Sequence, residues 1–256
     1  MNIRVLGAHN CESQNSKLIS LLIDDVLAID AGALTSSLSL EAQQKIKAIL
    51  LTHQHYDHIR DIPTLAMNFF LGGATIKVYS IPPVYDALAT HLLDDELYPD
   101  FRQQPPQNPT LRFTIIESDK LLQIEGYSIL AVPVNHSAPT VGYQVASPDG
   151  KAVFYTGDTG PGLSDCWQRV SPQLLIAEVT APDRYKGWAA RSGHLTPSLL
   201  KQELTSFREL NGYLPQVVVV HMNPALEKEI EAEIAAVGEA LSSSIALGYE
   251  GMQLHL

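Results

Sequence analysis

The stretch that decides the fold spans residues 48–58 and reads Ala48-Ile49-Leu50-Leu51-Thr52-His53-Gln54-His55-Tyr56-Asp57-His58. It opens with a short apolar run bounded by polar residues, which predicts a buried strand. Three histidines and an aspartate follow directly after this run. Imidazole and carboxylate groups at this density suit borderline transition metals, above all zinc, with manganese and iron as alternatives.

The spacing within this cluster indicates two metal positions. His53 and His55 are two residues apart at a strand end, so both can face the same ion. Asp57 and His58 are adjacent, so their side chains diverge and can serve a second ion beside the first. A polar loop whose histidines only bond the backbone is the simpler alternative, but four potential ligands together favour a metal site.

Length and charge limit the classes of protein and partner. The chain has 256 residues, within the range that an α/β fold occupies as one domain, and we expect a single domain over residues 1–256. The formal net charge of −11 disfavours broad contact with nucleic acid or anionic membranes. A metal centre would still attract a small anionic substrate, because the ions supply local positive charge.

The cysteines and the apolar runs bear on localisation. Cys11 and Cys166 are the only cysteines and give no disulfide framework. The first residues turn polar too soon for a signal peptide, and no apolar run approaches the ~20 residues of a membrane-spanning helix. We therefore expect a cytoplasmic protein with no membrane partner, and nothing in the sequence excludes a homo-oligomer.

Hydrophobic periodicity and turn residues predict strands and helices along the whole chain. Strands are expected at 3–8, 18–23, 26–30, 48–53, 75–80, 111–116, 121–124, 127–134, 141–146, 152–156, 173–178, 216–221 and the C-terminus. Helices are expected at 37–47, from an Asp61 cap to Gly72, at 82–93, 197–210 and 224–241, the last with an Asn223 cap. Residues 94–110 are expected to form an exposed loop. The pattern predicts an α/β fold with two sheets covered by helices.

Three further candidate ligands follow other expected strands. His136 follows the apolar segment 131–134, Asp158 follows 153–156, and His221 follows 217–220. Because neighbouring strand ends on one rim converge, these side chains could meet the 53–58 loop. Each residue taken singly could instead be a turn or helix-entry residue, but the shared context favours a common site.

A glutamate and a histidine narrow the chemistry. Glu178 ends an apolar strand, and His194 precedes the helix that begins at Thr196-Pro197. A histidine held by a glutamate is a positioned general acid, and phosphodiester cleavage expels an alkoxide that such a group could protonate. The alternative is that Glu178 bonds its own strand end and His194 is a loop residue.

These residues together resemble the metallo-β-lactamase superfamily, whose hallmark is H-x-H-x-D-H after a strand. Its phosphodiesterase branch, ribonuclease Z and the class II cyclic-nucleotide phosphodiesterases, carries equivalents of Glu178 and His194. The resemblance implies a four-layer αββα sandwich and two divalent metal ions bridged by a hydroxide nucleophile that Asp57 orients. It implies one metal on His53, His55 and His136, a second on Asp57, His58 and His221, and a bridge by Asp158.

The substrate that we expect differs from that of ribonuclease Z, which binds tRNA with a long arm inserted after the residue matching His136. Only a compact hairpin fills residues 136–158 here, and Asp61 replaces a glycine and adds a carboxylate near the site. With the acidic balance, these departures disfavour nucleic acid and favour a small phosphoester such as a cyclic or short nucleotide. Carboxylic-ester, thioester or lactone hydrolysis and tRNA 3′-end cleavage stay open, as does a metal-binding scaffold subunit.

Other residues have weaker claims on the site. Asp30 could lean toward the histidines or could simply form a turn before Gly32. Tyr143, Tyr185 and Trp188 could stack a base, although aromatic residues more commonly lie in the core or at a rim.

Overall fold

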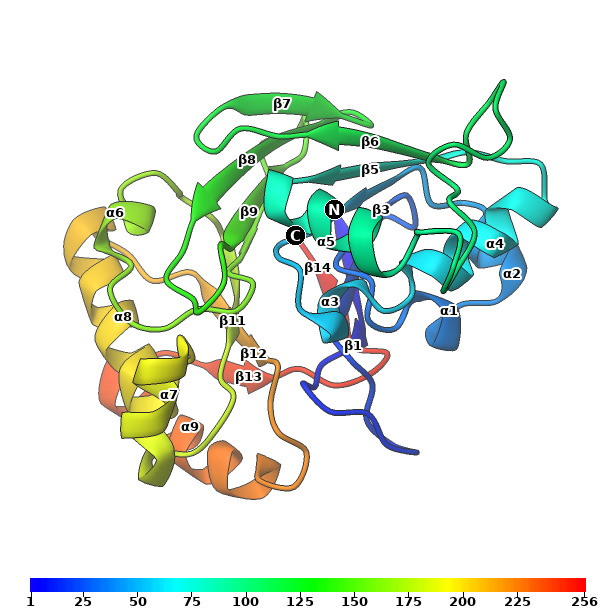
Figure 1. Ribbon diagram of the computed structural model, residues 1–256. Helices are drawn as coiled ribbons and strands as arrows, with labels where there is room; N and C mark the ends of the chain where they lie inside the picture. The colour runs from blue at the N-terminus through cyan, green and yellow to red at the C-terminus, as the bar shows by residue number, and fades with distance from the viewer.

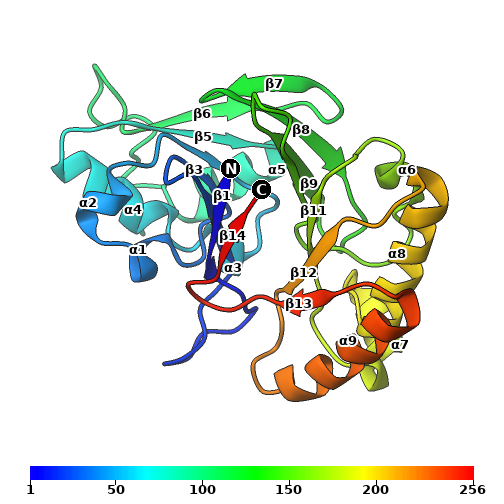
Figure 2. The same ribbon diagram turned by 180° about the vertical axis from the view of Figure 1, so that it is seen from behind.

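Two seven-stranded sheets face each other in the computed structural model, which describes residues 1–256. The first sheet has the strand order β14-β1-β2-β3-β4-β5-β6, and the second has β13-β12-β11-β10-β9-β8-β7. Helices lie on the outer side of each sheet, so the molecule has four layers, as Figures 1 and 2 show. The α/β sandwich predicted from the sequence is confirmed.

The strands of each sheet have the following bounds. The first sheet contains β1 (Asn2–Gly7), β2 (Ser20–Ile23), β3 (Leu27–Ile29), β4 (Ala48–Leu50), β5 (Ile76–Ser80), β6 (Leu111–Ile115) and β14 (Gln253–His255). The second sheet contains β7 (Leu121–Ile124), β8 (Tyr127–Pro133), β9 (Val141–Ala146), β10 (Ala152–Tyr155), β11 (Leu174–Glu178), β12 (Gln216–Val220) and β13 (Ile245–Leu247). Strands β3 to β6 pair in parallel, and so do β10 to β13. Parallel pairing brings the carboxyl ends of these strands to one edge, where α/β proteins place their sites.

The helices divide between the two sheets. Those beside the first sheet are α1 (Leu34–Ser37), α2 (Leu40–Gln43), α3 (Tyr56–Ile59), α4 (Ile62–Leu71) and α5 (Pro82–His91). Those beside the second are α6 (Ser164–Trp167), α7 (Lys186–Ser192), α8 (Pro197–Asn211) and α9 (Glu227–Leu241), with a 3-10 turn at Asp183–Tyr185. None of these helices combines the length and the apolar character needed to cross a membrane.

Alternation along β11 explains why its sequence is apolar throughout. Leu174 and Ile176 pack into a cluster of 47 buried residues that occupies the space between the sheets and also includes the buried faces of α4 and α5. Leu175 and Ala177 point the other way, into a cluster of 21 buried residues beneath α6, α8 and α9. A strand buried on both faces loses the polar half of the usual alternation, and this is why its sequence indicates a central strand.

Two helix predictions need correction. The expected helix 37–47 is wrong: α1 ends at Ser37, and only α2 (Leu40–Gln43) lies within the segment. Ser39 separates the two helices, and its side chain accepts a hydrogen bond from Ala42 N at the start of α2. The expected cap at Asn223 is not used, since its side chain bonds Ala225 N in a turn and α9 begins only at Glu227. Asp61 does occupy the N-cap position of α4, but its carboxylate makes no capping hydrogen bond.

Candidate metal centre

The cluster after β4 forms one wall of the site. His53 and His55 lie in the loop that follows this strand, and Asp57 and His58 lie in the first turn of α3. His55 occupies the N-cap position of that helix. The short helix therefore turns the chain so that all four side chains lie on one side of the loop.

The second sheet supplies the opposite wall. His136 follows β8, Asp158 follows β10, and His221 follows β12 directly. His221 adopts φ 65°, a left-handed conformation that a histidine rarely takes without a structural demand. The strand-end placement thus brings all three residues to the rim that faces the loop after β4.

Asp158 lies between two groups of imidazoles. Its Oδ2 is 3.6 Å from His53 Nε2 and 3.9 Å from His136 Nε2, whereas its Oδ1 is 3.2 Å from His58 Nε2 and 3.3 Å from His221 Nε2. One carboxylate therefore presents one oxygen to each group. Ligand atoms of the first group, which also includes His55, all lie within 4.8 Å of one another.

The remaining contacts complete the two groups. Asp57 Oδ2 lies 3.1 Å from His221 Nε2 and 3.6 Å from His58 Nε2, so these three residues form the second group. In the first group, His55 Nδ1 and His136 Nε2 are 3.2 Å apart. The structure thus brings together all seven residues predicted from the sequence, in the two predicted sets. Their role as metal ligands stays a prediction.

Outer hydrogen bonds fix the orientation of the imidazoles from the first sheet. His58 Nδ1 donates to Asp30 Oδ2 at 2.7 Å, and His53 Nδ1 lies 3.0 Å from Thr52 Oγ1. Thr52 Oγ1 itself donates to the Asp30 carboxylate, so its lone pairs are free to accept from His53. Asp30 also has φ 57°, so it both forms the turn and orients a histidine.

The imidazoles from the second sheet are held in the same way. His136 Nδ1 donates to Gly193 O at 2.7 Å, and His221 Nδ1 lies 2.9 Å from Thr180 Oγ1. A proton placed on Nδ1 leaves the Nε2 lone pair directed inward. Bonds of this kind orient imidazoles that bind metals.

Buried polar atoms without partners mark the interior of the site. His53 Nε2, His58 Nε2 and Asp158 Oδ1 are buried and accept or donate no hydrogen bond. Orphaned polar atoms are costly in a protein interior, and these three, grouped around the Asp158 carboxylate, fit the binding of cations. The donor set of nitrogen and carboxylate oxygen suits zinc, manganese or iron.

The charges of the first group also fit a cation. Burial lowers the pKa of His136, and burial together with the His58 imidazole holds the pKa of His53 well below its ordinary value. Burial opposes ionisation of Asp158, but the imidazoles of His221 and His58 hold its pKa well below the usual range. Neutral imidazoles and an ionised carboxylate are the protonation states that metal binding requires.

The second group has the more negative potential. Burial opposes ionisation of Asp57, but the imidazoles of His58 and His221 lower its pKa to about 2. Burial opposes the charge on His58, but the carboxylates of Asp158, Asp30 and Asp57 raise its pKa well above the ordinary value. This group therefore attracts positive charge strongly, as a cation site must.

Glu178 and His194 meet beside these groups, as the sequence predicts. His194 Nδ1 donates to Glu178 Oε1 at 2.7 Å, and Thr180 Oγ1 donates to Glu178 Oε2 at 3.1 Å. The His194 ring stacks between His221 at 5.6 Å and Trp188 at 5.9 Å. Burial opposes its charge, but the Glu178 carboxylate raises the pKa of His194 to about 9. His194 is therefore protonated at neutral pH.

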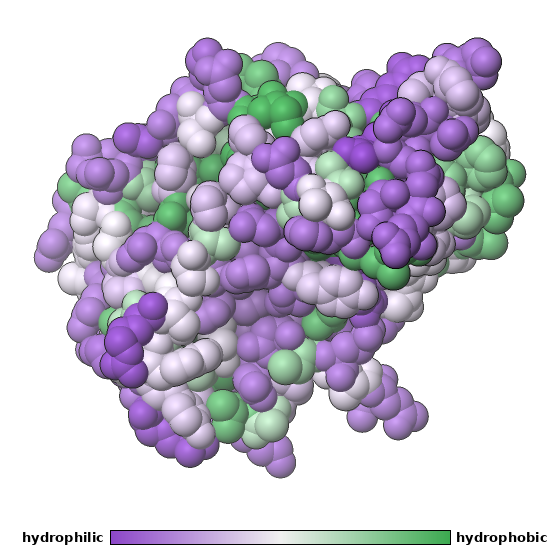
Figure 3. Space-filling view, viewed as in Figure 1, coloured by the Kyte–Doolittle hydropathy of each residue, from purple (hydrophilic) through white to green (hydrophobic).

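A cavity of about 560 Å³ opens over both groups and His194. In Figure 3, the surface between α3 and α7 is largely hydrophilic. Besides the predicted residues, this cavity is lined by Asn10, Cys11, Glu12, Leu18, Tyr56 and Arg60. The sequence did not predict the contributions of Cys11, Glu12 and the charged Arg60, although Arg60 stands only two positions after His58.

The three aromatic residues with weaker claims on the site lie in different surroundings. Tyr143 is fully buried and its hydroxyl donates to Leu51 O, so it belongs to the core. Tyr185 lies under the Arg184 guanidinium at the surface. Trp188 is 48% exposed and stacks on His194, so it is the one aromatic residue of the three that borders the candidate acid.

Comparison with known proteins identifies the family. Residues 21–222 match the beta-lactamase superfamily domain. The chain therefore belongs to the metallo-β-lactamase superfamily, as its sequence resemblance implied.

Two solved structures share the fold over nearly their whole length, and curated relatives match this chain over part of theirs. The crystal structure of unliganded yeast PDE1 superposes with a TM-score of 0.86 at 16% identity, covering 100% of this chain and 99% of that one. The short form of human tRNase Z gives a TM-score of 0.70 at 21% identity, covering 100% and 99%. In sequence, an octanoyltransferase of Porphyromonas gingivalis is 22% identical over 213 residues, which are 81% of this chain. The chain spans between 33% and 37% of the length of the curated relatives that it matches.

Proposed function

We propose that this protein is a dinuclear metal-dependent phosphodiesterase that cleaves a small phosphoester such as a cyclic or short nucleotide. The observation that carries the proposal is the Glu178–His194 pair, which lies against His221 of the candidate metal centre. A permanently positioned proton donor is of most use where the leaving group is a poor one, as the alkoxide of a phosphodiester is.

The residues that would hold the metals follow from the two groups. His53, His55 and His136 would bind one divalent cation, and Asp57, His58 and His221 a second, with Asp158 between them. Zinc suits this donor set best, with manganese or iron as alternatives. When bound, two such cations would lower the pKa of water toward ~7 and neutralise charge on the attacked phosphate.

Side chains of this protein would orient the attacking water and donate the proton to the leaving group. Asp57 is ionised across the pH range of catalysis, and its carboxylate would orient the attacking water. His194 would donate its Nε2 proton to the departing oxygen, because its Nδ1 proton is engaged with Glu178. The Glu178 carboxylate stabilises the imidazolium before transfer and, with Thr180, keeps the ring in place.

A small substrate fits the dimensions and the charge of the site. A cavity of about 560 Å³ has the size of pockets for small ligands. The segment between His136 and Asp158 holds only the β9–β10 hairpin, and the chain carries a net charge of −11. Human tRNase Z, by its name, acts on tRNA, but a polyanion of that size gains affinity from many basic contacts.

Replacement of His194 by alanine tests the reaction class. Phosphodiesters with an alkoxide leaving group should lose kcat by about a hundredfold or more, and p-nitrophenyl esters much less, because p-nitrophenolate leaves without a proton. His91→Ala, an exposed histidine at the end of α5, is the matched control. Equal losses for both leaving groups would rule out the general acid. Turnover of thioesters or lactones with none of phosphodiesters would favour the alternative hydrolase.

Metal analysis of the purified protein tests the centre separately. About two equivalents of zinc, manganese or iron per chain, and turnover that chelation abolishes, support a dinuclear enzyme. Tightly bound metal without turnover on a panel of phosphodiesters, precursor tRNA, thioesters and lactones would favour a scaffold subunit.

A further inference from the structure

Arg60 lines the cavity of the candidate metal centre and is held from one side by Asp61. Its Nε donates to Asp61 Oδ1 at 3.0 Å, and the other oxygen of that carboxylate accepts from Thr35 N at 2.7 Å. Asp61 is buried, so its carboxylate is a fixed anchor. The extra carboxylate expected near the site from the sequence is therefore neutralised by Arg60, and it does not line the cavity.

Arg60 is the only lysine or arginine among the residues that line this cavity. The other charged groups there are the carboxylates of Glu12, Asp57 and Asp158 and the histidine side chains. A guanidinium presents planar pairs of donors that match phosphate oxygens, and it stays charged at every physiological pH. With Nε bonded to Asp61 and Nη1 bonded to Glu12, Nη2 makes no hydrogen bond within the protein.

Glu12 is the second partner of Arg60, and it differs from Asp61 in exposure. The Glu12 side chain is 43% exposed, whereas that of Asp61 is 5% exposed. Exposed ion pairs contribute little net stability, so the Glu12 contact can be exchanged for another anion at small cost. The Asp61 contact would remain and would keep the guanidinium in position.

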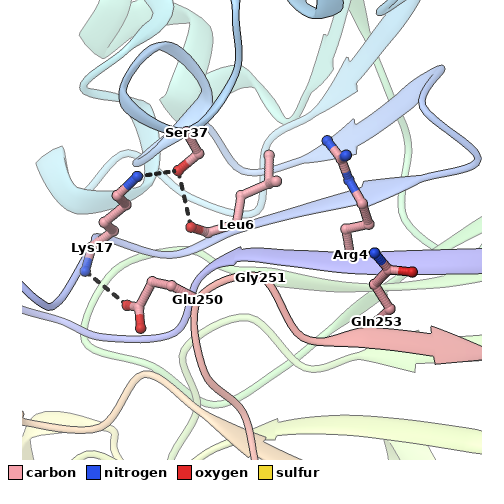
Figure 4. Close-up of a pocket in the computed structure, with 7 residues that line it drawn as sticks. All are labelled: Arg4, Leu6, Lys17, Ser37, Glu250, Gly251 and Gln253. Atoms are coloured by element: carbon pink, nitrogen blue, oxygen red, sulfur yellow. Dashed lines mark hydrogen bonds between the residues drawn. The ribbon is translucent and has the colours of Figure 1, made fainter.

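The loop that carries Glu12 is anchored at its base. His9 N donates to Lys17 O, and Lys17 N donates to the Glu250 carboxylate at 2.8 Å. Figure 4 shows this bond in a separate cavity of about 340 Å³, where Lys17 Nζ also bonds Ser37. Glu12 is thus held near Arg60 by a fixed loop base, while its own side chain stays exposed.

We propose that Arg60 is a specificity subsite for a second phosphate of the substrate, separate from the phosphodiester that is cleaved, and that Glu12 is the carboxylate this phosphate displaces. The inference rests on the proposed phosphodiesterase function and names the substrate class for it. The preferred substrate is a short nucleotide with a terminal phosphate in addition to the reacting one. Glu12 screens Arg60 from weaker anions, because any ligand must exchange for it.

Two substrates that differ by a single phosphate test the proposal. Thymidine 5′-(p-nitrophenyl phosphate) carries only the reacting diester, and its 3′-phosphorylated form adds the second anion. The measured quantity is the ratio of kcat/KM for the phosphorylated substrate to that for the unphosphorylated one. We expect Arg60→Gln to lower this ratio about tenfold, the size of one lost charge-assisted hydrogen bond. Arg60→Lys keeps the positive charge but lacks the planar pair of donors, so it should give an intermediate ratio.

Glu12→Gln gives the opposite prediction and does not touch the Asp61 anchor. It should raise the same ratio about threefold or more, because the neutral amide competes less for the guanidinium. The control is Arg169→Gln, which removes an arginine that pairs with exposed Asp119 and does not line the cavity; the ratio should stay at the wild-type value. Titration calorimetry with thymidine 3′,5′-bisphosphate gives a readout without turnover: its Kd should rise in Arg60→Gln and fall in Glu12→Gln.

The outcomes separate the two proposals. Hydrolysis of neither substrate by the wild-type protein would refute the phosphodiesterase function, and the calorimetric titration would still decide the role of Arg60. Hydrolysis of both, with one common ratio in wild type, Arg60→Gln and Glu12→Gln, would overturn the subsite and leave the function standing. A lower ratio in Glu12→Gln would also overturn it, because Glu12 would then assist binding.

Discussion

Glu178→Gln removes the negative charge beside His194 while it preserves the shape of the side chain. In the structure, His194 Nδ1 donates to Glu178 Oε1 at 2.7 Å, and Glu178 is fully buried. Burial lowers the pKa of His194, but the carboxylate outweighs burial and raises that pKa from 6.5 to about 9. At ~1.36 kcal/mol per pKa unit, the surrounding carboxylates, Glu178 foremost and then Asp158 and Asp57, favour the imidazolium by about 3 kcal/mol net of burial.

We expect the pKa of His194 in this variant to fall back toward its ordinary value of 6.5, because burial still disfavours the charge and only the smaller contributions of Asp158 and Asp57 oppose it. At pH 8 the protonated fraction of His194 would drop from about nine-tenths to about 3%, and kcat/KM for an alkoxide leaving group would fall roughly thirtyfold. At a pH below both pKa values, His194 is protonated in both proteins, so the two rates should converge there.

The assay is the pH dependence of kcat/KM for wild type and variant at equal metal content. Bound cations would lower the pKa of His194 in both proteins. The effect of Glu178 is therefore measured by the pH difference between the alkaline limbs of the two profiles. Glu203→Gln is the matched control: Glu203 is also buried, but it bonds Trp167 Nε1 and the 162–163 backbone away from the cavity. A Glu178→Gln profile that falls equally at every pH, with its alkaline limb in place, would refute the reasoning.

Three further predictions concern the same centre. Chelation should lower the free energy of unfolding by about 4 kcal/mol for each ion removed, relative to protein with metal at a thousandfold excess over Kd. Thermal melts before and after adding zinc measure this loss. Gly193→Ala should reduce both the amount of bound metal and the free energy of unfolding, the latter by roughly 1–3 kcal/mol. The reason is that Gly193 has φ +77° and a new Cβ would lie 2.7 Å from His136 Cα. Metal analysis and urea unfolding test this prediction. In metal-free protein, the contribution of His194 to stability should be complete below pH 6.5 and should decline as the pH rises through about 9, because the pKa of His194 is raised in the folded state. Urea unfolding at several pH values should show a smaller decline in Glu178→Gln.

The strands that carry the site are predictable because their signals are local. Central strands such as β4, β11 and β12 are apolar on both faces, and each ends in polar residues within a short window. Parallel order then places their carboxyl ends on one rim. This is why residues as distant as His53 and His221 can be assigned to one site from the amino-acid sequence alone.

The predicted helix boundaries were wrong where tertiary contacts outweighed the local sequence pattern. Gln43 is 2% exposed, and its amide donates to Leu38 O, so a polar side chain occupies a place that periodicity reserves for an apolar one. The segment 37–47 follows this bond and the turn at Ser39, and a continuous helix cannot form. Arg60 and Glu12 were missed for a similar reason: they are 48 residues apart in sequence, and only the fold brings their charges together.

The hydrogen bonds that orient the candidate ligands join segments that are far apart in the sequence. Thr180 lies two residues after Glu178, yet its hydroxyl contacts His221. Gly193 precedes His194, yet its carbonyl orients His136. The segment that holds the candidate acid therefore also orients two candidate ligands, one in each group. A substitution that displaces the 178–194 segment should consequently reduce metal content and proton donation together. Glu178→Gln keeps the backbone in place, so it should reduce proton donation more than metal content, and its effect on metal would pass through Thr180, whose hydroxyl contacts both Glu178 and His221.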